Sequence, residues 1–210
     1  PTPGETGIRW LAGALEGCVR LASLDLSCNE IEGNGVGWLA AALGSCTRLS
    51  RLDLGSNRVG AAGVSLVAGS LAGCKSLTSL DLRLNRIGAK GAEHLARELG
   101  RCSSLSRLVL SYNEIGEQGA GYLAGLFNLN TALSHVILRM TTIRDEGLGK
   151  LANALGLCPR LSHLDLGCSK VGDSGIASLS AILPKCEALT QLVLNDNSIS
   201  DEGAEKLAGV

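Results

Sequence analysis

The sequence predicts an α/β solenoid: a horseshoe of stacked strand–turn–helix units with a parallel sheet on the concave face and helices on the convex face. One observation is a leucine that recurs every 28 residues without a slip, and a period of this length is typical of stacked repeats. The leucines are Leu21, Leu49, Leu77, Leu105, Leu133, Leu161 and Leu189. A second is that Asn and Gly recur at fixed places after most of these leucines. A third is the composition, which is 45% hydrophobic but only 2% aromatic and so predicts an aliphatic core.

The first complete unit shows how one repeat folds. Leu24 and Leu26 alternate with polar residues, as in a strand with one apolar face. Asn29 then turns the chain, and Leu39 and Leu43 follow at helical spacing. Such a unit cannot bury its apolar face alone, so the units must stack. Because strands pack about 4.8 Å apart and helices about 8–10 Å apart, the stack must bend toward its sheet.

The unbroken register predicts a single domain over residues 1–210. It holds a partial unit over 7–20 and seven units that start at 21, 49, 77, 105, 133, 161 and 189, the last of them truncated. We therefore expect seven strands and eight helices. Neither end carries the polar capping unit that solenoids normally have, so further repeats or neighbouring subunits are expected to cover the ends.

One asparagine per unit predicts a buried hydrogen-bond ladder along the turns. An Asn side chain can pair with the backbone of the neighbouring turn, and its amide has the necessary donors and acceptor. The column comprises Asn29, Asn57, Asn85, Asn113 and Asn197. It is interrupted by Thr141 and Ser169, which have less hydrogen-bonding capacity. Units five and six are therefore expected to be the loosest.

Six of the eight cysteines share one position at the helix end. They are Cys18, Cys46, Cys74, Cys102, Cys158 and Cys186. Equivalent positions on packed helices lie about 8–10 Å apart, beyond the roughly 7 Å Cα separation that a disulfide allows. We expect free, buried thiols and hence a reducing cytoplasmic location. No CxxC or paired Cys/His spacing indicates zinc.

Composition and motifs exclude several function classes. The formal net charge is −1 with no basic block, which argues against nucleic acid. No apolar run suggests membrane insertion, and the first residues do not form a signal peptide. No nucleophile elbow, phosphate loop or Cys/His arrangement supports catalysis, so neither an enzyme nor a cofactor is expected.

The repeat LxxLxLxxNxIxxxGxxxLAxxLxxC resembles the ribonuclease-inhibitor-type subfamily of leucine-rich repeats from Gly7 onward. The uniform 28-residue units look similar to the sensor arrays of nucleotide-binding innate receptors, although the nucleotide-binding part is missing. The resemblance implies a horseshoe that binds proteins through its concave face. It does not identify the partner.

Outward-facing residues of units three to five form the candidate partner-binding surface. An apolar centre with an arginine rim is typical of binding hot spots. The predicted centre is Leu84, Val109, Tyr112, Ile137 and Met140, and the rim is Arg83, Arg107, Arg139 and His135. The alternative is that these turn side chains fold over the sheet edge. Units one to three are instead acidic with interspersed arginines, and a solvated charged face is the simplest interpretation there.

Two smaller features allow alternative interpretations. His135 and His163 fall on neighbouring strands, where surface polarity is a simpler explanation than a metal or a pH switch. Trp10 and Trp38 share a helical position, and we expect them to fill the groove between helices; a convex interface is the alternative.

Three functions fit the sequence. The first is a cytoplasmic module that binds a protein partner on its concave face. The second is a structural scaffold subunit of a larger assembly. The third is a regulator of a small GTPase, which the resemblance implies because Ran GTPase-activating protein belongs to the ribonuclease-inhibitor-type subfamily.

Overall fold

The computed structural model describes residues 3–100 and 102–209, which form eight α-helices, seven β-strands and one short 3-10 helix. The strands are β1 (Ser23–Asp25), β2 (Arg51–Asp53), β3 (Ser79–Asp81), β4 (Arg107–Val109), β5 (His135–Ile137), β6 (His163–Asp165) and β7 (Gln191–Val193). The helices are α1 (Pro3–Leu15), α2 (Gly33–Leu43), α3 (Gly60–Leu71), α4 (Gly88–Leu99), α5 (Gly116–Leu129), α6 (Arg144–Leu155), α7 (Asp173–Ser180) and α8 (Asp201–Ala208), and η1 (Leu183–Lys185) follows α7. The predicted numbers of strands and helices are confirmed.

The seven strands form one parallel sheet in the order of the sequence. Leu24 lies opposite Leu52, and Leu52 lies opposite Leu80, so that paired residues are 28 positions apart in the chain. This register is kept through β7. The α/β solenoid predicted from the repeat is confirmed.

The core lies between the sheet and the helices. Leu80 and Leu82 reach it from β3 and the residue after it, and Leu95 and Leu99 reach it from α4; all four are fully buried. Phe127 on α5, the only phenylalanine, is also fully buried. Near the ends of the sheet, Leu24 and Leu192 are only partly buried, because in the described part of the chain β1 and β7 each have a neighbouring strand on one side only.

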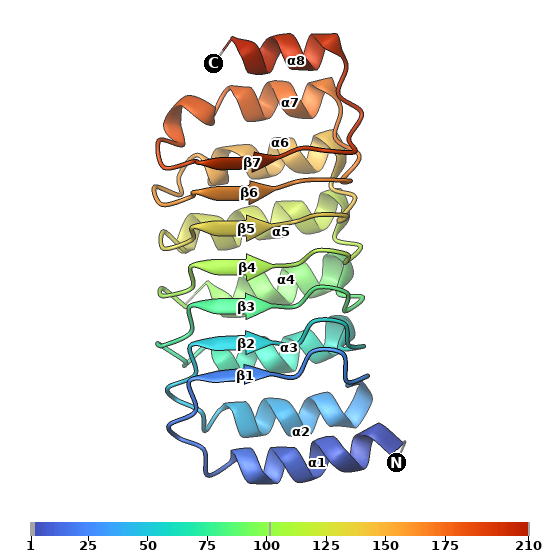
Figure 1. The fold of residues 1–210 in the computed structure, drawn as a ribbon, viewed down its shortest axis with the longest axis vertical. Helices are drawn as coiled ribbons and strands as arrows, with labels where there is room; N and C mark the ends of the chain where they lie inside the picture. Colours follow the sequence, from blue (N-terminus) through green and yellow to red (C-terminus); the bar gives the residue numbers. More distant parts are fainter. Residues whose placement is uncertain (1–2, 101, 210) are drawn as a thin grey trace.

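The stack is curved. In Figure 1 the helices are spaced more widely than the strands, and α1 and α8 extend beyond the two ends of the sheet. This follows from the larger packing distance of helices. The sheet therefore lies on the concave face, and the turns that follow the strands line one rim of it.

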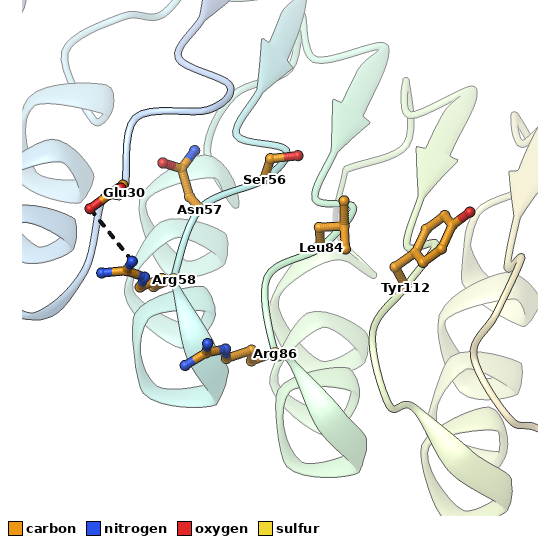
Figure 2. Close-up of a pocket in the computed structure, with 7 residues that line it drawn as sticks. All are labelled: Glu30, Ser56, Asn57, Arg58, Leu84, Arg86 and Tyr112. Carbon is orange, nitrogen blue, oxygen red and sulfur yellow. Dashed lines mark ion pairs between the residues drawn. The ribbon is translucent and has the colours of Figure 1, made fainter.

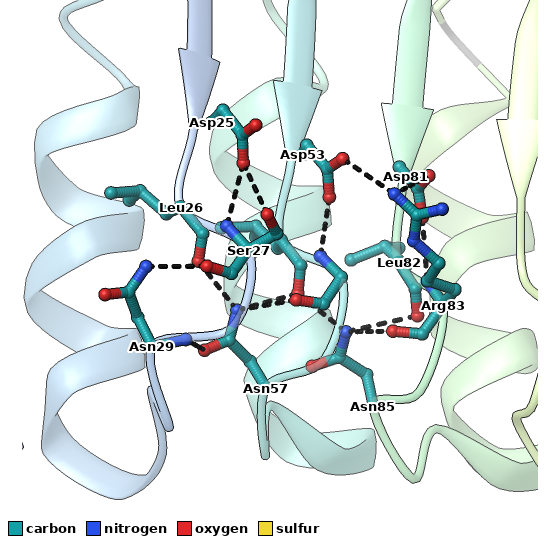
Figure 3. A network of polar contacts seen from close by, with 12 residues as sticks. Asp25, Leu26, Ser27, Asn29, Asp53, Asn57, Asp81, Leu82, Arg83 and Asn85 are labelled. Atoms are coloured by element: carbon teal, nitrogen blue, oxygen red, sulfur yellow. Dashed lines mark hydrogen bonds and ion pairs between the residues drawn. The ribbon is translucent and has the colours of Figure 1, made fainter.

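The asparagine ladder links each turn to the next (Figure 3). The Asn57 Oδ1 atom accepts the backbone N–H groups of Asn29 and Ile31, at 3.1 and 2.9 Å. Its Nδ2 atom donates to three backbone carbonyls, of which Leu26 and Leu54 are 2.9 Å away. A single amide thus satisfies backbone groups of two units, as the sequence predicted.

The ladder changes character in units five and six. The Thr141 hydroxyl donates to the Leu138 carbonyl at 2.5 Å, inside its own turn. The Ser169 hydroxyl reaches back to the same Leu138 carbonyl at 2.9 Å. Within the described chain, no unit-five side chain accepts the backbone N–H groups of Asn113 and Ile115 in the way that Asn113 serves the preceding unit.

We expect Thr141→Asn to stabilise the chain by about 1 kcal/mol, because a carboxamide oxygen could accept the Asn113 N–H group, whereas the Ile115 N–H already donates to the Asn113 carbonyl. Urea unfolding followed by circular dichroism measures the gain. Hydrogen exchange measures its location: in the wild type the Asn113 amide should exchange faster than the equally buried Asn85 amide, which donates to Asn113 Oδ1, and the substitution should slow it. Equal protection of the two wild-type amides would show that the interruption costs nothing.

The helix-end cysteines point into the stack and carry no disulfide among the described residues. Five of the six are buried, whereas Cys18 in the first unit is half-buried. Burial raises the pKa of Cys102 and of Cys158 to about 11. These two thiols are therefore protonated at neutral pH. Cys28, in a turn, is the exposed one.

At pH 8, Cys28 is expected to react with a thiol reagent in the native protein, followed by the half-buried Cys18 and Cys168. The five buried thiols should react only after unfolding, because burial keeps the reagent away from them. Cys102 and Cys158, with a pKa of about 11, are in addition only roughly 0.1% thiolate at that pH. Titration with and without denaturant, with mass spectrometry of the modified sites, checks the order. Rapid labelling of Cys102 in the native state would contradict it.

The tryptophans behave differently from one another. Trp38 packs against the core, and the Arg9 guanidinium lies 5.7 Å from its ring centre. Trp10 is 74% exposed, so the expectation that it fills a groove is wrong. Trp10 lies on the first helix, where no preceding helix is described that could form the second wall of a groove.

Candidate protein-binding surface

The turn after each strand projects one side chain from a left-handed backbone. Leu84, Tyr112 and Met140 have φ angles of 54°, 57° and 53°. The same column has positive φ in all seven units, from Cys28 to Asp196. The conformation therefore belongs to the fold, and costs a residue with a Cβ about 1–2 kcal/mol. Only the identity of the side chain varies.

The apolar centre is exposed at the turns and covered on the sheet. Leu84, Tyr112 and Met140 are 46%, 43% and 43% exposed. Ile137 is half-buried on β5. Val109 is only 4% exposed, so its assignment to the accessible surface is wrong. Val109 lies on β4, the central strand of the sheet, between its register partners Asp81 and Ile137. The accessible centre is a row of three turn residues.

Arg83 lies flat over the N-terminal part of the concave face (Figure 3). Its Nη2 atom is 3.2 Å from Asp53 Oδ2 and 3.3 Å from Asp81 Oδ2. The Arg83 side chain passes over Gly55, where an added Cβ would lie 2.9 Å from the Arg83 Nε atom. Arg83 is therefore neutralised by two carboxylates.

Arg139 runs in the opposite direction, toward the C-terminal units. Its Nη1 atom donates to Asn195 Oδ1 at 2.8 Å, two units away, and its Nη2 atom is 3.7 Å from Asp196. Gly167 makes this possible, since any Cβ there would collide with the guanidinium. The nearby Tyr112 hydroxyl raises the pKa of Arg139. Arg83 and Arg139 thus extend in opposite directions along the array, and Tyr112 of unit four lies between their two units.

The remaining rim residues lie on neighbouring strands. Arg107 and His135 are register partners, as are His135 and His163. The two imidazoles stack with their centres 5.6 Å apart and their planes 17° apart. Burial, followed by the charges of Arg107 and His163, lowers the pKa of His135. No group of three or more His, Cys, Asp or Glu suited to a metal occurs in the described part of the chain.

The carboxylates on the acidic face of units one to three already accept hydrogen bonds from their own turns. The pKa of Asp25 is lowered because the Ser27 N–H and hydroxyl donate to it, at 2.9 and 2.7 Å. Burial raises the pKa of Asp81, although the Arg83 N–H donates to its carboxylate. Asp53 accepts the Gly55 N–H at 2.8 Å. These carboxylates are largely occupied in holding the turns.

The sequence did not reveal a hollow on the turn rim beside the apolar row (Figure 2). It has a volume of about 370 Å³. Its lining residues are Glu30, Ser56, Asn57, Arg58, Leu84, Arg86 and Tyr112. The sequence does contain a sign of this hollow. Two residues after the projecting turn residue, adjacent units two and three both have an arginine, Arg58 and Arg86.

Comparison with known families fits this architecture. The sequence model described as "Leucine Rich repeat" matches residues 20–40, 45–68, 73–96, 101–124, 158–180 and 185–208, which is more than half of the chain. The chain belongs to the leucine-rich repeat family. The matched segments of this leucine-rich repeat chain leave out residues 125–157, which include Thr141, where the asparagine ladder is interrupted. Among curated proteins, none matches.

Solved structures share the fold at low sequence identity. The chain is similar to the actin-binding site 2 of leiomodin-1, with 20% identity, a TM-score of 0.58, and coverage of 76% of this chain and 90% of the other. It is similar to the C-terminal domain of a Caenorhabditis elegans tropomodulin, with 14% identity, a TM-score of 0.57, and coverage of 73% and 92%. It is also similar to an internalin from Listeria monocytogenes, with 17% identity, a TM-score of 0.54, and coverage of 92% and 61%. At such identities the likeness concerns the fold alone. None of the described helices is both long and apolar enough to cross a membrane.

Proposed function

We propose that this leucine-rich repeat chain is a protein-interaction module whose partner docks on the concave centre and on the adjoining turns of units three to five. The observation that carries the proposal is the row of Leu84, Tyr112 and Met140, three large apolar side chains more than 40% exposed on adjacent turns. Arginines and a histidine surround them, and hot spots usually combine an apolar centre with such a rim.

Several features support the finer points of the proposal. The unit pattern fits the ribonuclease-inhibitor-type subfamily and one continuous domain. Buried thiols suit a reducing cytoplasmic compartment. The net charge of −1 and the carboxylates among the arginines fit a protein partner better than nucleic acid. The proposal includes no catalysis and no cofactor.

One observation favours a structural scaffold as the second candidate. Trp10 is 74% exposed on α1, and an exposed large aromatic side chain is a natural contact for a neighbouring chain. No feature of the geometry favours GTPase regulation in the same way. The matched part of leiomodin-1 is described as an actin-binding site, which makes actin a reasonable first protein to assay.

The test is affinity capture with the wild-type chain and four variants. Wild type and Leu66→Ala, a control at a 53% exposed leucine on α3, are expected to capture the same partner. Tyr112→Ala and Met140→Ala are expected to lose it. Trp10→Ala addresses the scaffold candidate. Loss of the partner from Trp10→Ala alone would overturn the concave site and favour the scaffold.

A further inference from the structure

The hollow on the turn rim contains an arginine that no described carboxylate neutralises. Arg58 lies 3.5 Å from Glu30 and 3.7 Å from Glu32, so its charge is already balanced. Arg86 is exposed, and within residues 3–100 and 102–209 it has no carboxylate partner within 4.0 Å. Figure 2 shows it on the helix side of the turn that carries Leu84, with its guanidinium directed toward the side of Arg58 and away from Tyr112.

A second hollow adjoins the first and shares two of its walls. It has a volume of about 270 Å³ and is lined by Arg86, Gly88, Tyr112 and Glu114. Gly88 has a φ of +62°, and only the Glu114 carbonyl lies near its missing Cβ, at 3.8 Å. Arg86 and Tyr112 therefore stand between two depressions, one beside Leu84 and one beside Gly88.

On these grounds, and resting on the proposed function, we propose that the two hollows bind a segment of the protein partner in which a large apolar residue stands next to an aspartate or glutamate. The apolar side chain packs between Leu84 and Tyr112, and the neighbouring carboxylate meets the Arg86 guanidinium. Arginine binds carboxylates in a planar, two-bond geometry that lysine cannot match.

The surrounding charges select this class of ligand. Glu30 and Glu114 line the two hollows, so a run of phosphates would meet repulsion on either side of Arg86. A single carboxylate bound at Arg86 avoids repulsion from both Glu30 and Glu114. The hollows are also shallow openings on a rim, whereas small-molecule sites enclose most of their ligand. One or two protruding side chains of a peptide fill such openings better.

Random peptides displayed on phage, selected on the immobilised full chain, test the inference. Wild type is expected to enrich peptides in which Asp or Glu adjoins Leu, Ile, Met or Phe. The best peptide, made synthetically, is expected to bind Arg86→Gln and Tyr112→Ala at least tenfold more weakly. Replacing its acidic residue by the matching amide should have the same effect on wild type and almost none on Arg86→Gln.

Arg97→Gln is the matched control, since Arg97 belongs to the same unit but lies on α4 and pairs with Glu98. It is expected to bind the peptide within twofold of wild type. Failure to enrich acidic–apolar peptides, or equal binding by Arg86→Gln, overturns the inference. The proposed function has a separate readout: if Met140→Ala loses the native partner while Arg86→Gln keeps it, the concave site stands and the rim site falls.

Discussion

Tyr112→Ala is expected to weaken binding of the native partner by about 2 kcal/mol, or roughly thirtyfold in Kd. The phenol ring lies at the middle of the exposed row, between Leu84 and Met140, and a tyrosine offers large contact area with little rotamer entropy to lose. Its hydroxyl lies beside Arg139, which adds a polar contact at the edge. Isothermal titration calorimetry with the captured partner measures the loss.

A glycine at the same position separates binding from stability. Because Tyr112 has a φ of +57°, Tyr112→Gly should be about 1 kcal/mol more stable to unfolding than Tyr112→Ala. Both variants lack the ring, so both should lose the same affinity. If the glycine variant recovers binding together with stability, the alanine variant failed by unfolding and Tyr112 is not an anchor.

Asn85→Ala is expected to destabilise the chain by about 3 kcal/mol, because its amide is fully buried and water cannot replace it. The Nδ2 atom donates to the carbonyls of Leu54, Leu82 and Arg83, at 2.8, 3.2 and 3.0 Å. The Oδ1 atom accepts the Val59 N–H at 3.2 Å. The midpoint of urea unfolding, followed by circular dichroism, measures the effect.

Asn29→Ala is the control for this prediction. Asn29 occupies the same column but is exposed, and its side-chain amide donates only to the Ser27 carbonyl, at 2.8 Å. Its loss should cost less than about 1 kcal/mol, since water can solvate the freed carbonyl. Similar costs for the two substitutions would mean that burial of the side chain does not determine how much an asparagine of this column stabilises the chain.

The sequence was sufficient to predict the fold because the repeat period determines register directly. A 28-residue spacing between leucines places Leu24, Leu52 and Leu80 opposite one another, and the structure has this pairing. The ladder was likewise predictable, since a buried carboxamide has few other ways to satisfy its atoms. Both depend on local geometry that is the same in every unit.

The candidate surface was less predictable because it depends on differences between units. Val109 occupies a strand position that alternates with the core leucines and so was expected to face outward, yet it is only 4% exposed. The directions of Arg83 and Arg139 depend on side-chain conformation and on where a Cβ is missing. Glycines in the column after the strand, Gly55 and Gly167, were the available signal that an arginine could cross to another unit.

The bond from Arg139 to Asn195 joins unit five to unit seven and bypasses unit six. The stability of a linear repeat array is ordinarily a sum of unit energies and nearest-neighbour interfaces, so that fraying at one end is not felt two units away. Here, opening of unit seven would release the arginine that borders Tyr112. A partner that requires this arginine in place would therefore keep unit seven closed, and by linkage opening of unit seven would weaken the partner's affinity.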